Sequence, residues 1–220
     1  GVLLSPRETY AAVAARPRSF GVLAVVLFLV VGAQIGVLST ETGRDLMLGQ
    51  ILEQQVRSMH SAGRPVTAET YAQMETQMTR FLYVIPAANL ITIPILMAIS
   101  AGLLTGVFSM LLGGAATFKQ VYAIVAHSSV IVGVQAVFTV ALTLVAGKMA
   151  GANLAIFLPM LEEGTFAFNL LSAIDLFLIW STISTAIGIG VLYKRRTGPV
   201  AVGLLLVYAV IALVIAFVRS

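Results

Sequence analysis

Long stretches without a charged residue decide what this sequence can fold into. Charged residues divide the chain into uncharged runs at 19–40, 81–118, 120–147, 176–193 and 197–218. A helix needs about 20 apolar residues to cross a bilayer. Backbone polar groups in lipid must be paired within the spanning segment, and these runs are too long for barrel strands. The pattern therefore predicts an all-α, polytopic integral membrane protein.

The composition excludes most other classes of protein. Hydrophobic residues make up 59% of the 220 residues and charged residues 10%, against about 45–50% and about 25% in soluble domains. The net charge is +4, but the 13 Lys and Arg residues flank apolar runs, so we expect a lipid bilayer as partner and no nucleic acid. The sequence has no Cys, and its two His residues lie far apart. With no catalytic or cofactor-binding motif present, we expect neither an enzyme nor a bound metal or cofactor.

Five spans are predicted within a single membrane domain that covers residues 1–220. The first run could instead be a cleaved signal peptide, but it is longer than the usual apolar core of about 7–15 residues, so we interpret it as a retained helix. The predicted spans lie at about 20–38, 84–112, 126–146, 172–193 and 198–218.

The run at 81–118 leaves the number of spans open. Its 38 residues form either one long helix, with Pro86 and Pro94 in its first half, or two half-spans. Two full spans would place the basic turn Lys194–Arg196 outside, against the positive-inside rule. We therefore predict one span, kinked or begun late near the prolines. The N-terminus is then cytoplasmic and the C-terminus extracytoplasmic, and we expect the bacterial inner membrane.

The segment 39–80 is the only sizeable polar insertion, and its pattern predicts an extracytoplasmic helical hairpin. A turn signal at 61–65 separates two stretches with apolar residues at helical spacing, and Thr67 is suited to cap the second helix. The apolar residues either hold the two arms together or form a surface for a partner or a second copy. The residues of this possible partner surface are Leu48, Ile51, Val56, Met59, Tyr71, Met74 and Met78.

Asp175 is the one acidic residue that adjoins a predicted span closely enough to suggest function. An acid inside a membrane is a functional candidate. However, Ser172 and Asp175 also form an S-x-x-D capping box before an apolar run, so we interpret Asp175 as a helix cap rather than a proton relay.

Small residues provide candidate helix-packing positions. Gly32 and Gly36 form one GxxxG motif, Gly102 and Gly106 form another, and Gly188 lies in the fourth predicted span. Small residues let helices approach closely in lipid. These positions predict packing within the chain or, alternatively, a homodimer seam.

Several short motifs together resemble a known family. They are Ser5–Tyr10 with Arg16–Arg18, Phe118–Ala123, and the pattern Asp175-x-Phe177-x-x-Trp180 with the later Gly188. These segments resemble bacterial members of the Yip family (Ypt/Rab-GTPase-interacting proteins). The resemblance implies five spans with a cytoplasmic N-terminus. Eukaryotic relatives are implicated in vesicle trafficking, GTPase binding and membrane shaping, of which GTPase binding is not carried over to this chain.

These observations predict a non-enzymatic scaffold or accessory subunit that associates with other membrane proteins or with itself. The alternative is a transporter or channel for ions or small molecules. Asp175, Gln34, Gln135 and the proline-bearing second span motivate that alternative, because broken helices with polar residues mark transport sites.

Overall fold

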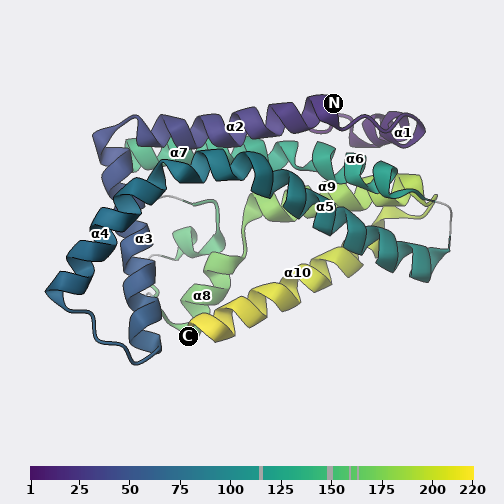
Figure 1. The fold of residues 1–220 in the computed structure, drawn as a ribbon. Helices are drawn as coiled ribbons and strands as arrows, with labels where there is room; N and C mark the ends of the chain where they lie inside the picture. Colours follow the sequence, from purple (N-terminus) through teal and green to yellow (C-terminus); the bar gives the residue numbers. More distant parts are fainter. Residues whose placement is uncertain (114–115, 148–150, 159, 163) are drawn as a thin grey trace. The chain divides into compact units, whose positions relative to one another are not determined.

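The computed structural model describes residues 1–113, 116–147, 151–158, 160–162 and 164–220 (Figure 1). Within these residues the secondary structure is helical, apart from one isolated antiparallel bridge between Asn153 and Asp175. The elements are α1 (Pro6–Ala15), α2 (Phe20–Leu38), α3 (Glu41–Ser61), α4 (Ala68–Leu82), α5 (Val84–Leu112), α6 (Phe118–Ser128), α7 (Val130–Ala146), the 3₁₀ helix η1 (Leu154–Phe157), α8 (Phe166–Ala173), α9 (Leu176–Leu192) and α10 (Thr197–Arg219). The all-α prediction is confirmed for this part of the chain.

The chain divides into two compact units. One unit comprises residues 1–26, 94–135 and 151–220, and the other comprises 27–93 and 136–150. The helices α2, α5 and α7 contribute to both units, and in α5 the division falls at Pro94, whose ring removes one backbone hydrogen bond from the helix.

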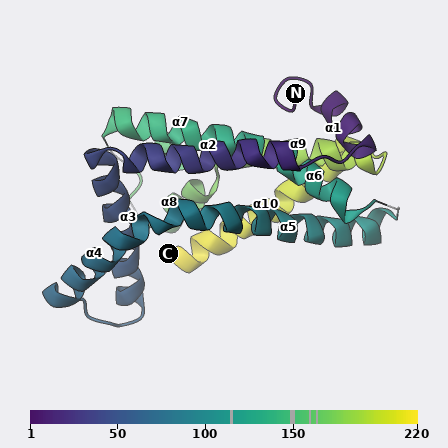
Figure 2. The same ribbon diagram turned by 45° about the horizontal axis from the view of Figure 1, so that its top comes forward.

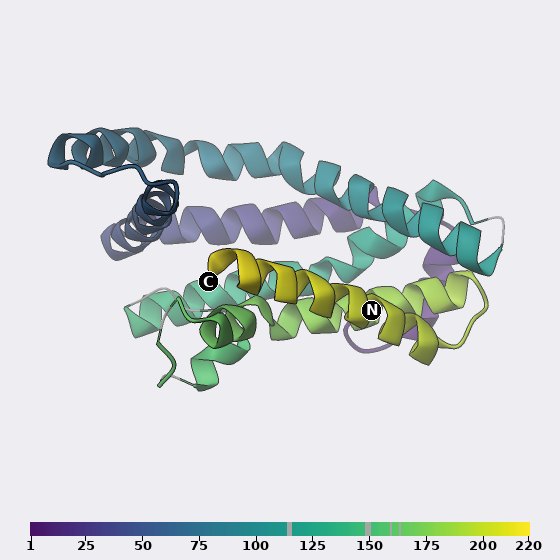
Figure 3. The ribbon, with the colours of Figure 1, turned by 90° about the horizontal axis from the view of Figure 1, so that it is seen from below.

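In the first unit, α1 and α6 pack on α9, while α10 packs on α9 and α8 (Figure 3). The side chains of Tyr10, Val13 and Ile124 are buried between α1, α6 and α9. A side chain of α6 fixes the end of α1, since the Gln120 Nε2 donates to the Ala14 carbonyl at 2.9 Å. Thus α1 is a packed element of the bundle.

In the second unit, a tight corner joins α2 to α3, and α3 and α4 contact each other (Figure 2). The Thr40 hydroxyl accepts a hydrogen bond from the Gly43 amide at 3.0 Å and so caps α3. A Cβ on Gly43 would collide with the Val37 carbonyl, so the corner requires glycine. The two helices predicted on either side of the turn are present and contact each other, and Thr67 caps α4 as its sequence suggests.

Within the described residues, four apolar helical segments are long enough to cross a membrane: Phe20–Leu38, Val84–Leu111, Phe118–Ala146 (α6 and α7 together) and Thr197–Arg219. The run at 81–118 contains one continuous helix, α5, and not two half-spans. The fourth predicted span, 172–193, is wrong at its start, because α8 ends at Ala173 and α9 begins only at Leu176. The helix α9 is also apolar, but with 17 residues it is shorter than these four segments.

Candidate functional site

Asp175 occupies the junction between α8 and α9. Its Oδ1 accepts hydrogen bonds from the amides of Phe177 at 2.8 Å and Leu178 at 3.0 Å. Asp175 is therefore the N-cap of α9, where a carboxylate satisfies amides that lack an intrahelical partner and interacts favourably with the helix dipole.

The second carboxylate oxygen of Asp175 joins α9 to α7. Its Oδ2 accepts a hydrogen bond from the Gln135 Nε2 at 2.6 Å. The Tyr208 hydroxyl of α10 accepts from the Asp175 amide at 2.9 Å and donates to the Ala173 carbonyl at 2.8 Å. Tyr208 thus pairs two of the backbone groups that the break between α8 and α9 leaves without helical partners.

The backbone around Asp175 also holds the segment before η1. The Leu154 amide donates to the Ile174 carbonyl and the Leu176 amide donates to the Ala152 carbonyl, each at 3.0 Å. These two bonds form the isolated bridge described above. Four parts of the first unit therefore meet at Asp175: α7, α10, the α8–α9 junction and the segment before η1. Sequence reasoning did not predict the contributions of Tyr208 and Asn153, because each depends on a contact with a distant part of the chain.

The other residues of the predicted fourth-span motif have different roles. Ser172 is inside the last turn of α8, so it does not form the capping box with Asp175 that the sequence suggests. The rings of Phe177 and Trp180 contact each other with centroids 6.3 Å apart, and Trp180 remains 41% exposed. In an apolar helix, this exposure suits a side chain that faces lipid.

A second polar cluster joins α1, α6 and α9. The Tyr10 hydroxyl is hydrogen-bonded to the Ser184 hydroxyl at 2.7 Å, and the Thr185 hydroxyl donates to the Ser128 Oγ at 2.8 Å. Tyr10 is fully buried, and this burial raises the pKa of its phenol to about 12, so the group is neutral at physiological pH. Sequence reasoning missed Tyr10 and Ser184; the only available signal was the position of Tyr10 in the segment before the first span.

Among the predicted packing glycines, Gly188 has close neighbours. A Cβ on Gly188 would collide with Ile124 and come within 3.1 Å of the Tyr10 ring. The Gly32, Gly36, Gly102 and Gly106 positions have no such neighbour within 4 Å inside their own units. Glycine is therefore required at 188 for α1 and α6 to approach α9.

The predicted hairpin surface is only partly covered. The α3–α4 contact buries Leu52 and Met74, whereas Tyr71 stays 43% exposed. The remaining five residues of the predicted surface are half-buried: Leu48, Ile51, Val56, Met59 and Met78. The two arms therefore share a narrow seam and leave apolar surface open beside it.

In the part of the chain that the structure describes, no buried side-chain nitrogen or oxygen lacks a hydrogen-bond partner. The Gln34 and Asn89 amides of the second unit, for example, bond to each other at 3.0 Å. Among the same residues, no group of three His, Asp or Glu side chains could hold a metal ion. Internal pairing of this kind is what the hydrocarbon of a bilayer demands.

Long apolar helices with internally paired polar groups define a polytopic helical membrane protein. The family model described as the Yip1 domain matches residues 1–218, nearly the whole chain, and the chain belongs to this family. The resemblance found in the sequence is confirmed. No curated protein and no solved structure matches the chain.

Proposed function

We propose that this chain is a non-enzymatic scaffold or accessory subunit of a membrane assembly and that its α3–α4 hairpin contacts the partner. The membership in the Yip1 family and the apolar helices support a membrane role. The observation that carries the partner surface is the incomplete cover of the hairpin seam: its core is buried at Leu52 and Met74, but Tyr71 is 43% exposed. Apolar and aromatic surface beside a packed seam is typical of protein interfaces.

The proposed topology has five spans, a cytoplasmic N-terminus, and the hairpin outside the cytoplasm. It requires α9 to cross with 17 residues, which correspond to about 25 Å against a hydrocarbon core of about 30 Å. Local thinning of the bilayer and flanking polar residues accommodate such a mismatch. Asp175 at one end and the Lys194–Arg196 turn at the other are suited to this, and the basic turn favours the cytoplasmic side.

Site-specific photo-crosslinking in native membranes tests the partner surface. A photoreactive amino acid at Tyr71 is expected to give a defined higher-mass adduct. A matched probe at Thr76, which is exposed on the same helix and lies about 140° around it, is expected to give none. An adduct at twice the chain mass would identify a second copy as the partner. Absence of any adduct at Tyr71, or equal adducts at both positions, would contradict the proposal.

The transporter alternative depends on polar side chains inside the helices. The three side chains that motivate it, those of Asp175, Gln135 and Gln34, are engaged in hydrogen bonds. Gln135 donates to Asp175, and Gln34 accepts from Asn89. We assign them a role in helix association, since interhelical hydrogen bonds stabilise membrane proteins. Flux across liposomes that depends on the Asp175 carboxylate would instead favour the transporter.

A further inference from the structure

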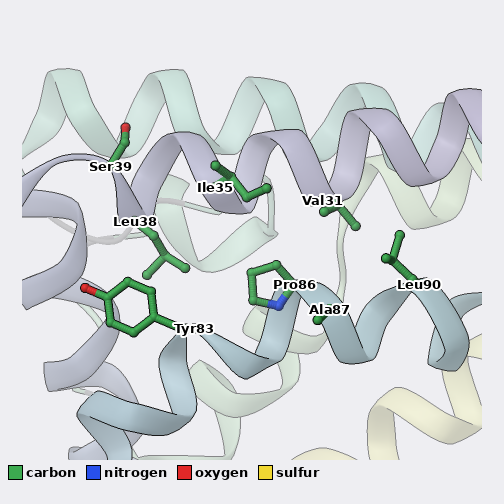
Figure 4. A pocket seen from close by; sticks show the side chains of 8 residues that line it. All are labelled: Val31, Ile35, Leu38, Ser39, Tyr83, Pro86, Ala87 and Leu90. Carbon is green, nitrogen blue, oxygen red and sulfur yellow. The ribbon is translucent and has the colours of Figure 1, made fainter.

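A groove in the second unit runs between α2 and α5 (Figure 4). It has a volume of about 420 Å³. Its walls are apolar along most of its length, and hydroxyl groups lie at one end. The lining residues are Val31, Ile35, Leu38 and Ser39 from the α2 side, and Tyr83, Pro86, Ala87 and Leu90 from the α5 side.

The two ends of the groove differ in polarity. Ser39 and Tyr83 are both at the end where α2 finishes and α5 begins, whereas Val31 and Leu90 lie at the other end (Figure 4). Seven residues separate Leu38 from Val31, which corresponds to about 10 Å of helix. The proposed topology puts the polar end at the membrane boundary, so that a groove of this length lies within one leaflet of a hydrocarbon core of about 30 Å.

A cationic side chain lies at the polar end. The Arg44 Nη1 donates a hydrogen bond to the carbonyl of Leu38, a groove-lining residue, at 3.1 Å. The glycine-dependent corner at Gly43 brings Arg44 back to this position. A guanidinium has five N–H donors, and the bond to Leu38 uses one of them, so Arg44 retains the capacity to bind a phosphate.

The deep end is braced by a polar contact. The hydrogen bond between Gln34 and Asn89 joins α2 to α5 beside Ile35 and Leu90. This bond fixes the separation of the two helices, so the groove is formed in the absence of a ligand, as in most small-molecule sites.

The polarity and the charge of the groove indicate its occupant. A narrow, flexible hydrocarbon chain suits the apolar walls, and Arg44 complements an anionic group at the boundary. We propose that the groove binds one acyl chain of an anionic phospholipid, with the headgroup phosphate at Arg44.

Native mass spectrometry of the full-length protein in detergent, titrated with phosphatidylglycerol or phosphatidylcholine, tests this site. Ala87 lines the groove, whereas the adjacent Ala88 is also exposed but does not line it. Ala87→Trp is expected to weaken phosphatidylglycerol binding about tenfold, which corresponds to the loss of one well-formed contact, and Ala88→Trp is expected to leave it unchanged. Equal effects of the two variants, or no effect of either, would overturn the proposal.

Substitutions of Arg44 test the headgroup contact separately. Arg44→Gln retains an amide donor but lacks the charge, so the preference for phosphatidylglycerol over phosphatidylcholine is expected to fall about tenfold. Arg44→Lys is expected to retain much of that preference. If Arg44→Gln left the preference unchanged, or if Ala87→Trp altered only the dimer signal, the groove would not be a phospholipid site. A change in the dimer signal alone would assign the groove to a second copy of the chain.

Discussion

Replacing Asp175 tests whether the junction between α8 and α9 is structural. Asp175→Ala removes the cap of α9, which stabilises by about 1 kcal/mol, and the hydrogen bond to Gln135, which contributes about 0.6 kcal/mol and at most about 1.7 kcal/mol between membrane helices. The free energy of unfolding is therefore expected to fall by about 1.5–2.5 kcal/mol. Asp175→Ser separates the two parts: serine can cap the helix but cannot provide the carboxylate oxygen that reaches Gln135. Asp175→Ser should therefore recover most of the stability that Asp175→Ala loses.

The protein carries its own probe for this measurement. Trp180 is the single tryptophan and lies five residues after Asp175, so its fluorescence during unfolding in mixed micelles reports on α9. The sequence has one other aspartate, the exposed Asp45 of α3, and Asp45→Ala is a matched control expected to change stability by less than about 0.5 kcal/mol. In a double-mutant cycle, Asp175→Ala and Gln135→Ala are expected to show a coupling of about 0.6 kcal/mol. The reasoning is refuted if Asp175→Ser is as unstable as Asp175→Ala, or if the coupling is zero.

Three further predictions concern α1 and α9. Because burial raises the pKa of Tyr10 from 10.0 to about 12, the folded state holds the phenolic proton more tightly than the unfolded state. The associated stability is fully present below pH 10 and is lost as the pH rises through 12; unfolding measured across this range should show a decline that Tyr10→Phe reduces. Gly188→Ala is expected to destabilise by about 1–3 kcal/mol through overpacking against Tyr10, whereas Gly102→Ala should be neutral or stabilising; thermal unfolding that ranks them in reverse would contradict the packing. Lys194 adopts a left-handed conformation (φ 53°) at the end of α9, so Lys194→Gly should raise stability by about 1 kcal/mol, and an unchanged unfolding midpoint would count against strain there.

Local sequence patterns predicted the helices best where the only information needed is continuous apolar character. The predicted spans at 20–38 and 84–112 have the same bounds as α2 and α5, and charged residues or a proline mark the start of each helix. The start of α9 was misplaced because apolar residues stand on both sides of Asp175, in α8 as well as in α9, and hydropathy alone does not locate a break between two apolar helices. The break there depends on Gln135 and Tyr208, which lie 40 and 33 residues from Asp175.

The same limit applies to the glycines and the lipid groove. GxxxG spacing identifies Gly32 and Gly102 as candidates, yet among the predicted packing glycines it is Gly188 that has close neighbours within its unit, and one of them, Tyr10, comes from a distant part of the chain. Likewise, the groove requires Val31 and Leu90 on neighbouring helices and Arg44 turned back at the corner. Local patterns contain no information on such pairings.

The membrane topology is the central claim, and cysteine labelling tests it most directly. The sequence has no native Cys, so single substitutions at the exposed positions Ala11, Ser61 and Ser220 can be labelled one at a time with a membrane-impermeant maleimide. Ser61→Cys and Ser220→Cys are expected to react in intact cells, and Ala11→Cys only after permeabilisation. Reaction of Ala11→Cys and Ser220→Cys under the same condition would place both ends of the chain on one side and contradict a five-span protein.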